Sequence, residues 1–222
     1  MNSFRSPILA LGACLVATMA FTADSLAQAK EDPRAVAHFE AGVAAYQAND
    51  LPLAFQEFRE AATAGHADSQ FNLALMYEQG IGVGKNEKEA VVWYGKSAAQ
   101  GNASAQFNLG VMYENGRGTK VDFAKANQWY RRASIQRDAL AIGNLGMLYL
   151  RGDGVKENQV AGVALLLLSA SRDQSPENHA KQNLAAARGL TPEMIAAAQT
   201  LFNDLGSAQN LLLPLDKYLE TH

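Results

Sequence analysis

The chain has 222 residues, of which 48% are apolar and 18% are charged, and its formal net charge is −3. This composition is typical of a globular protein rather than a disordered one, and the length suffices for one extended core or two small ones. Because there is no basic surplus, the charge argues against a nucleic acid or an anionic lipid surface as the partner.

The first 29 residues have the three-part layout of a secretory signal peptide. A short positive start, Met1–Arg5, precedes an apolar run, Ile8–Phe21, and a small, polar segment, Ala23–Ala29. Two small-x-small sites fit cleavage, after Ala27 and after Ala29, and we favour the second. An uncleaved membrane anchor is the alternative, but the apolar run has 14 residues, whereas a helix that spans a bilayer needs about 20.

The only cysteine, Cys14, lies inside this leader. It follows a Leu-x-small pattern, as the lipidated cysteine of a lipoprotein does, but the apolar run continues beyond it where a lipobox should end the leader. We therefore favour cleavage without lipidation and predict a periplasmic or secreted protein. Removal of residues 1–29 leaves no cysteine, which excludes disulfides, thiol catalysis and cysteine-ligated metal.

Residues 30–65 predict a first helical hairpin that differs from the units after it. Pro33 suits a helix start, and apolar and small side chains then recur at helical spacing. Asn49 and Asp50 interrupt this pattern, which resumes at Pro52.

Residues 66–137 consist of two tandem copies of a 36-residue repeat. Aligned without a gap, 66–101 and 102–137 are identical at 14 positions, and a third, more divergent copy occupies 138–173. A fixed period in this range predicts stacked supersecondary units, each with an apolar face that it buries against its neighbour.

Each copy has the pattern of two helices joined by a glycine turn. The first helix, 67–79 in the first copy, ends at a Gly-x-Gly, and glycine suits the left-handed backbone that terminates a helix. A residue suited to an N-cap and a second helix follow. The first glycines and the N-cap residues recur at the repeat spacing: Gly80, Gly116, Gly152, Asn86, Asp122 and Asn158.

Two further columns predict how these helices pack. Ala74, Gly110 and Gly146 share a position on the first helix, where the absence of bulk would let the partner helix approach closely. The second helix carries Trp93 or Trp129 in the first two copies. We expect these tryptophan-bearing helices to wedge between successive hairpins.

Residues 174–222 predict a helical cap. The segments 175–177 and 191–193 each combine an N-cap residue, a proline and an acid, so they predict helices that end near Gly189 and Gly206. A solenoid needs such an end, because its terminal unit otherwise exposes a stacking face.

Two details of the cap are also predicted. The apolar tail 211–215 contains Pro214, which indicates either a short last helix or an extended segment. The helix that begins at Pro192 should bury one apolar stripe. The stripe consists of Ile195, Ala198, Phe202 and Leu205.

Two stretches carry a family resemblance: Ala-x-x-Gln-Phe-Asn-Leu-Gly-Val-Met-Tyr-Glu-Asn-Gly-Arg-Gly at 103–118, and Asp-x-x-x-Ala-x-x-Trp-Tyr-x-x-Ala at 122–133. They resemble the Sel-one-like repeat (SLR), a relative of the tetratricopeptide repeat. The resemblance covers 66–137 and extends over 138–171, while 35–65 is similar to an ordinary tetratricopeptide unit. It implies an all-α fold, a right-handed solenoid of helical hairpins (an α-α superhelix), used as an interaction scaffold.

The resemblance also implies an alternative activity. Some secreted members, cross-braced by a cysteine pair in every repeat, are linked to penicillin or peptidoglycan binding. This chain lacks those cysteines, which argues against that branch of the family.

The sequence contains no familiar catalytic spacing. His-Glu-x-x-His, Gly-x-Ser-x-Gly and Ser-x-x-Lys are all absent. The glycine-rich stretch 80–85 has the wrong spacing for a phosphate loop, and helices flank it where a strand is required. The four histidines share no ligand spacing. We therefore predict no catalysis, no metal and no cofactor.

The column of Asn72, Asn108 and Asn144 is the candidate binding feature. The resemblance to tetratricopeptide repeats places it on the concave wall, where side-chain amides would bind the backbone of an extended peptide. In the alternative, each asparagine bonds to the neighbouring repeat and fixes the stacking, and the two roles can coexist. The residues flanking the column that would shape the groove are Phe71, Phe107, Glu78, Glu114 and Asn115.

The sequence thus predicts an exported, non-enzymatic scaffold that binds a protein or a peptide in the cell envelope. We expect no nucleic-acid partner and no stable membrane span once the leader is cleaved. One alternative is a peptidoglycan- or β-lactam-binding envelope protein or enzyme. Another is a structural element of a larger envelope complex.

Overall fold

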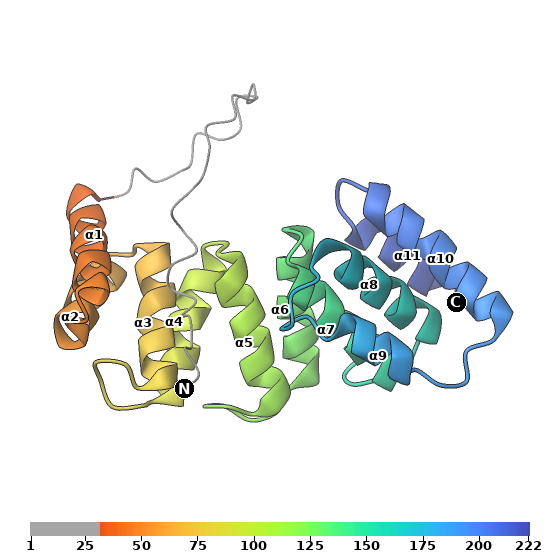
Figure 1. Ribbon diagram of the computed structural model, residues 1–222, viewed down its shortest axis with the longest axis horizontal. Coiled ribbons are helices and arrows are strands. Elements are labelled where there is room, and N and C mark those ends of the chain that lie inside the picture. Colours follow the sequence, from red (N-terminus) through yellow and green to blue (C-terminus); the bar gives the residue numbers. More distant parts are fainter. Residues whose placement is uncertain (1–31) are drawn as a thin grey trace, which may run out of the picture.

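The computed structural model describes residues 32–222, which form eleven α-helices and no strand (Figure 1). The predicted signal peptide and Cys14 lie outside the described residues. The helices are α1 Pro33–Gln47, α2 Leu51–Thr63, α3 Ala67–Gln79, α4 Glu87–Ala99, α5 Ala103–Asn115, α6 Phe123–Ile135, α7 Ala139–Arg151, α8 Gln159–Arg172, α9 Ala180–Ala186, α10 Pro192–Ser207 and α11 Leu212–Thr221. The all-α prediction is confirmed.

The first eight helices pair as hairpins, α1 with α2 through α7 with α8. Each second helix also packs on the first helix of the next hairpin, so α4 and α6, which carry Trp93 and Trp129, lie between successive hairpins as predicted. Figure 1 shows the hairpins side by side in chain order along the long axis.

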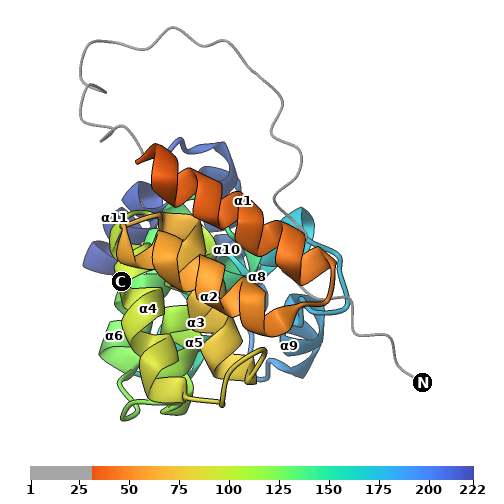
Figure 2. The same cartoon turned by 90° about the vertical axis from the view of Figure 1, so that its left-hand side faces the viewer.

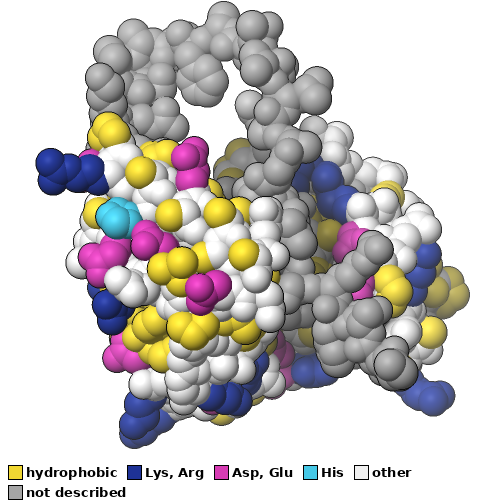
Figure 3. Space-filling view, turned by 60° about the vertical axis from the view of Figure 1, so that its left-hand side comes forward, with side chains coloured by type: hydrophobic (Ala, Val, Ile, Leu, Met, Phe, Trp, Pro, Cys, Tyr) yellow, Lys and Arg dark blue, Asp and Glu magenta, His cyan; other side chains and the backbone are white. Residues whose placement is uncertain are grey.

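The hairpin of α1 and α2 covers one end of this row, as Figure 2 shows. In the space-filling view of Figure 3, apolar side chains on this side of the molecule are interspersed with acidic and basic ones. The terminal unit therefore presents a mixed surface in place of a continuous apolar one.

The predicted N-caps form. The side chains of Asn86, Asp122 and Asn158 accept hydrogen bonds from the backbone N–H groups of Glu89, Lys125 and Ala161, at the starts of α4, α6 and α8. Each bond satisfies a donor that has no partner within its own helix.

Each Gly-x-Gly turn uses its two glycines differently. At Gly118, the second glycine of its turn, φ is +66° and an added Cβ would collide with the carbonyl group of Glu87 and lie 2.9 Å from the backbone nitrogen of Lys88. This glycine therefore lets the turn lie against the start of α4, the second helix of the preceding hairpin. Gly82 and Gly154 approach α2 and α6 in the same way. The first glycines have the predicted left-handed φ and end their helices: Gly80 at 75°, Gly116 at 67° and Gly152 at 71°.

The column of small residues gives the predicted close approach. An added Cβ at Gly110 would lie 2.6 Å from the buried ring of Tyr130, and one at Gly146 would lie 2.9 Å from the carbonyl oxygen of Gly162. These contacts join α5 to α6 and α7 to α8. A side chain at either position would force the two helices of the hairpin apart.

Glutamine side chains form a second set of contacts, between the first helix of a repeat and the end of its second helix. Gln100 Nε2 donates to Gln70 Oε1 at 2.7 Å, and Gln136 Nε2 donates to Gln106 Oε1 at 2.9 Å. Each donor also reaches a backbone carbonyl oxygen, that of Gly65 or Gly101, in the turn before the first helix of its own repeat. The third copy has other residues in these columns: Ile142 and Arg172.

The cap differs from its prediction at α9. This helix begins at Ala180, whereas the sequence predicted a start at Pro176. The Asp173 carboxylate accepts hydrogen bonds from the N–H and the hydroxyl of Ser175, at 2.8 and 2.9 Å. The Asn178 amide donates to the carbonyl oxygens of Asp173 and Ser169. These bonds hold the Ser-Pro-Glu segment as a turn on the end of α8, so the helix starts only after it.

The apolar stripe of α10 is also displaced from its prediction. Ile195 is 53% exposed, and the buried positions are Ala198, Leu201 and Leu205. The start of α10 at Pro192, with Thr191 as N-cap, is as predicted. Of the two alternatives for the tail, the helix forms, as α11.

One apolar cluster joins the cap to the last two repeats. Buried side chains of α10 and α11 pack with those of α6, α7 and α8. Arg131 of α6 donates to both carboxylate oxygens of Asp216 in α11, at 2.5 and 2.6 Å. None of the helices within residues 32–222 has the length and apolarity that a bilayer crossing requires.

Candidate functional site

The predicted site residues share one side of the first helices of the repeats. On α5, three of these residues follow Phe107 by one, seven and eight positions, a spacing that places all four on the same side of the helix. They are Asn108, Glu114 and Asn115. The same positions recur on α3, and Asn144 continues the asparagine column on α7. We call the surface formed by these positions the A-helix face.

The asparagines of the second and third repeats bond to the preceding hairpin. Asn108 Nδ2 donates to the hydroxyl oxygen of Tyr94 at 3.3 Å, and that hydroxyl donates to Glu78 at 2.5 Å. The junction of the second and third repeats has the same arrangement. Asn144 Nδ2 donates to the hydroxyl oxygen of Tyr130 at 3.0 Å, and that hydroxyl donates to Glu114 of the second repeat at 2.6 Å.

These contacts support the interpretation that the column fixes repeat stacking, and they leave part of it available. Asn108 and Asn144 are half-buried, and their Oδ1 atoms have no hydrogen-bond partner among residues 32–222. Asn72 is only 4% exposed, and Phe71 is buried against Tyr94 with ring centroids 5.8 Å apart. The accessible part of the column therefore lies in the second and third repeats.

The tyrosine hydroxyls in this network remain donors at all physiological pH values. Burial, together with the neighbouring carboxylates of Glu78 and Glu114, raises the pKa of both Tyr94 and Tyr130 far above the usual range. Each hydroxyl therefore keeps its proton and orients both its carboxylate and its asparagine.

The two glutamates differ in how their charge is balanced. Glu78 forms an ion pair with Arg117 at 2.8 Å, and the same guanidinium lies 3.5 Å from Glu87. Glu114, one repeat later, has no cationic side chain within ion-pair distance among the described residues. The second repeat therefore presents a half-buried negative charge that only the hydroxyl of Tyr130 stabilises.

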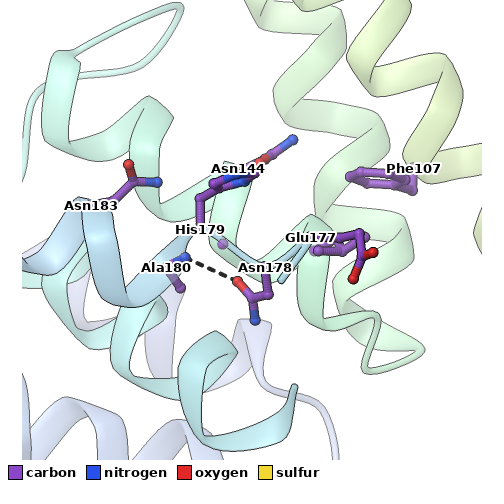
Figure 4. Close-up of a pocket in the computed structure, with 9 residues that line it drawn as sticks. Phe107, Asn144, Glu177, Asn178, His179, Ala180 and Asn183 are labelled. Atoms are coloured by element: carbon purple, nitrogen blue, oxygen red, sulfur yellow. Dashed lines mark hydrogen bonds between the residues drawn. The ribbon is translucent and has the colours of Figure 1, made fainter. Parts of the chain in front are cut away.

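A pocket of about 210 Å³ lies beside Asn144, whose amide shares the Tyr130 hydroxyl with Glu114. Figure 4 shows Phe107 and Glu177 on one side of it and Asn183 on the other. Two of the predicted site residues, Phe107 and Asn144, line it. The others come from α7, from α9 and from the turn before α9: Leu140, Gly143, Glu177, Asn178, His179, Ala180 and Asn183.

The pocket has an origin that can be read in the repeat columns. Gly143 stands where the first two copies have Phe71 and Phe107, so the third copy lacks the aromatic ring at this point of the face. The cap segment covers part of the vacated space, and Asn178 Oδ1 lies 3.9 Å from where a Cβ of Gly143 would be. Gly143 is therefore the sequence signal for a pocket at this position, which we did not predict from the sequence.

The remaining predicted residues lie outside the pocket. Glu114 is half-buried. Asn115 is exposed at the end of α5, where its amide donates to the carbonyl oxygen of Val111 at 2.9 Å. Within residues 32–222, no group of three or more His, Cys, Asp or Glu side chains is arranged to hold a metal ion.

Comparison with known proteins agrees with this architecture. The Sel1 repeat family model matches residues 67–102, 103–138 and 139–174, each beginning one residue after the corresponding predicted unit. No curated protein matches the chain at a significant level.

Two solved structures are similar to the chain. One is a Sel1 repeat protein from Oxalobacter formigenes, with 34% identity and a TM-score of 0.62 over 68% of this chain and 63% of that one. The other is c5321, a protective antigen of uropathogenic Escherichia coli strains that displays an SLR fold. It shares 28% identity, with a TM-score of 0.64 over 84% of this chain and 46% of that one. The chain thus spans less than two thirds of either protein. With three consecutive family repeats in the predicted register and a matching fold, the chain belongs to the Sel1-like repeat proteins.

Proposed function

We propose that this protein is an exported, non-catalytic scaffold whose A-helix face binds an extended segment of a partner protein. The observation that carries the proposal is the pair Asn108 and Asn144. Each amide nitrogen is held by a buried tyrosine, and each carbonyl oxygen has no partner among the described residues. These two oxygens can accept hydrogen bonds from the backbone N–H groups of a bound peptide. Because the tyrosines already hold both asparagine side chains in place, little conformational entropy is lost when the peptide binds.

The charge and shape of the face support the same proposal. Beside the asparagine oxygens, the face carries the carboxylate of Glu114 and the pocket next to Asn144. Such a surface offers backbone recognition along the row and a side-chain site at one end.

A displayed library of random peptides, selected on the purified protein, tests the binding function. We expect the selected peptides to bind at least about tenfold more weakly, a change of about 1.4 kcal/mol, to the Asn115→Arg variant, which places a long cation on the A-helix face. Gln128→Arg is the matched control, because Gln128 is exposed on α6 and outside this face. Affinities are measured by fluorescence anisotropy.

Two outcomes would contradict the proposal. One is a failure to select any peptide. The other is an equal loss of affinity in Asn115→Arg and Gln128→Arg, which would show that binding does not use this face.

The export part of the proposal is supported by the layout of residues 1–29. We expect protein recovered from the envelope fraction to begin at Lys30, or at Gln28 if cleavage follows Ala27. Its intact mass distinguishes these two forms from the full-length chain. Recovery of the full-length chain from the cytosol alone would show that export does not occur.

A further inference from the structure

The pocket between α5, α7 and α9 is lined by several polar side chains that have no partner within the described part of the chain. Glu177, His179 and Asn183 make no side-chain hydrogen bond or ion pair with any residue in 32–222. Asn178 differs, because its Oδ1 accepts from Ala180 N and Ser169 Oγ and its amide nitrogen is also used. The groups left for a ligand are therefore one carboxylate, the Asn144 Oδ1, the Asn183 amide and the imidazole.

The lining is matched to a positive charge. None of the nine lining residues is Lys or Arg. Glu177 supplies a negative charge on the same side as the half-buried ring of Phe107 (Figure 4). A cation placed over an aromatic face and beside a carboxylate gains from both, and a planar guanidinium also uses its several N–H donors toward acceptor oxygens. The unbalanced charge of Glu114 lies two hydrogen bonds from Asn144, through Tyr130.

From this geometry we infer that the pocket binds a basic side chain, arginine in preference to lysine, of the partner segment. The guanidinium lies between the Phe107 ring and the Glu177 carboxylate and donates to Asn144 Oδ1. This inference rests on the proposed peptide-binding function and names the residue that anchors the peptide. It also assigns a role to the turn before α9, because that turn brings Glu177 to the same pocket as Phe107 of α5.

The test uses two short peptides of nearly the same shape: acetyl-Gly-Arg-Gly-amide and its citrulline analogue, in which a neutral ureido group with a carbonyl oxygen replaces the charged guanidinium. Both are titrated into the purified protein, and binding is followed by amide chemical shifts in NMR spectra. We expect the arginine peptide to bind about tenfold more tightly than the citrulline peptide, as for hydrogen bonds and contacts that involve a full charge. The shifts should concentrate at Gly143, Asn144 and residues 177–183.

Two variants locate the effect. Glu177→Gln removes the carboxylate from an exposed turn, so we expect the fold to persist and the preference for arginine over citrulline to be lost. Glu40→Gln removes the same charge from an exposed position on α1, at the other end of the row (Figure 1), and should leave the preference unchanged.

The inference is overturned if arginine and citrulline peptides bind alike, if neither binds up to its solubility limit, or if Glu177→Gln keeps the preference. If one of these results is obtained while the library peptides still bind Asn115→Arg more weakly, the pocket assignment is wrong and the proposed function stands. If, in addition, the library peptides lose no more affinity in Asn115→Arg than in Gln128→Arg, the proposed function is wrong as well.

Discussion

Gly118→Ala is expected to lower the free energy of unfolding by about 3 kcal/mol, the sum of two costs that are each on the order of 1–2 kcal/mol. An alanine at φ +66° has a strained left-handed backbone. Its Cβ would also collide with the backbone of Glu87 and Lys88 at the start of α4. Backbone atoms cannot rotate away as a side chain does, so the turn after α5 must move off the preceding hairpin. Urea unfolding followed by far-ultraviolet circular dichroism measures the change.

Gly189→Ala is the matched control for this substitution. Gly189 has a similar φ of +75°, but an added Cβ there would meet no atom within 4 Å. It should therefore show the backbone cost alone, about 1–2 kcal/mol. Equal losses in Gly118→Ala and Gly189→Ala would show that the contact between this turn and α4 does not stabilise the stack.

Leu205→Ala is expected to destabilise the protein by about 2–5 kcal/mol, as for other fully buried leucines. Leu205 is completely buried in the cluster that joins α10 and α11 to the last two repeats. Its removal leaves a cavity between the cap and α8, because α10 packs directly on α8. Thermal unfolding monitored by circular dichroism gives the change in Tm, and tryptophan fluorescence reports the same transition from Trp93 and Trp129.

Leu213→Ala is the control for the cap. Leu213 is 68% exposed on α11, so its loss should change stability by less than about 0.5 kcal/mol. If Leu205→Ala produced a separate early transition and left tryptophan fluorescence unaffected, the cap would be an independent unit and not the closing element of the solenoid.

Those parts of the fold with strong local signals were predictable from the sequence. The N-caps Asn86, Asp122 and Asn158 and the glycine ends of the first helices depend on residues within a few positions of one another. The 36-residue period then places each copy beside the next, without any knowledge of distant contacts. Helix α3 has the predicted bounds, 67–79, and the three N-caps stand where they were predicted.

The cap was harder to predict because competing local signals there are settled by packing. The Ser-Pro-Glu segment has the features of a helix start, but Asp173 accepts from the N–H and hydroxyl of Ser175, and the Asn178 amide donates to the carbonyl oxygen of Asp173, so a turn forms instead. On α10, Ile195 and Leu201 lie on two adjacent apolar stripes that both include Ala198 and Leu205. Only the position of α8 decides which stripe is buried.

The candidate site was predictable in part. The asparagine column and Phe107 were found from the repeats, and the structure shows that Tyr94 and Tyr130 orient the second and third asparagines. Gly143 marks the missing ring in the sequence, but the walls of the pocket could not be predicted, because they depend on how the cap brings Glu177 near α5. Such an approach is a long-range contact with no local sequence pattern.

The paired glutamines within the first two copies have a consequence for the evolution of chain length. Each pair is complete inside its own 36-residue copy, and its donor reaches the preceding unit through a backbone carbonyl oxygen, so a duplicated copy would carry its own pair and find the same acceptor. Gene duplication could therefore lengthen the array without redesigning an interface. The third copy has Ile142 and Arg172 in these columns, so its duplication would not reproduce these contacts, and the first two copies are the units suited to lengthening the array.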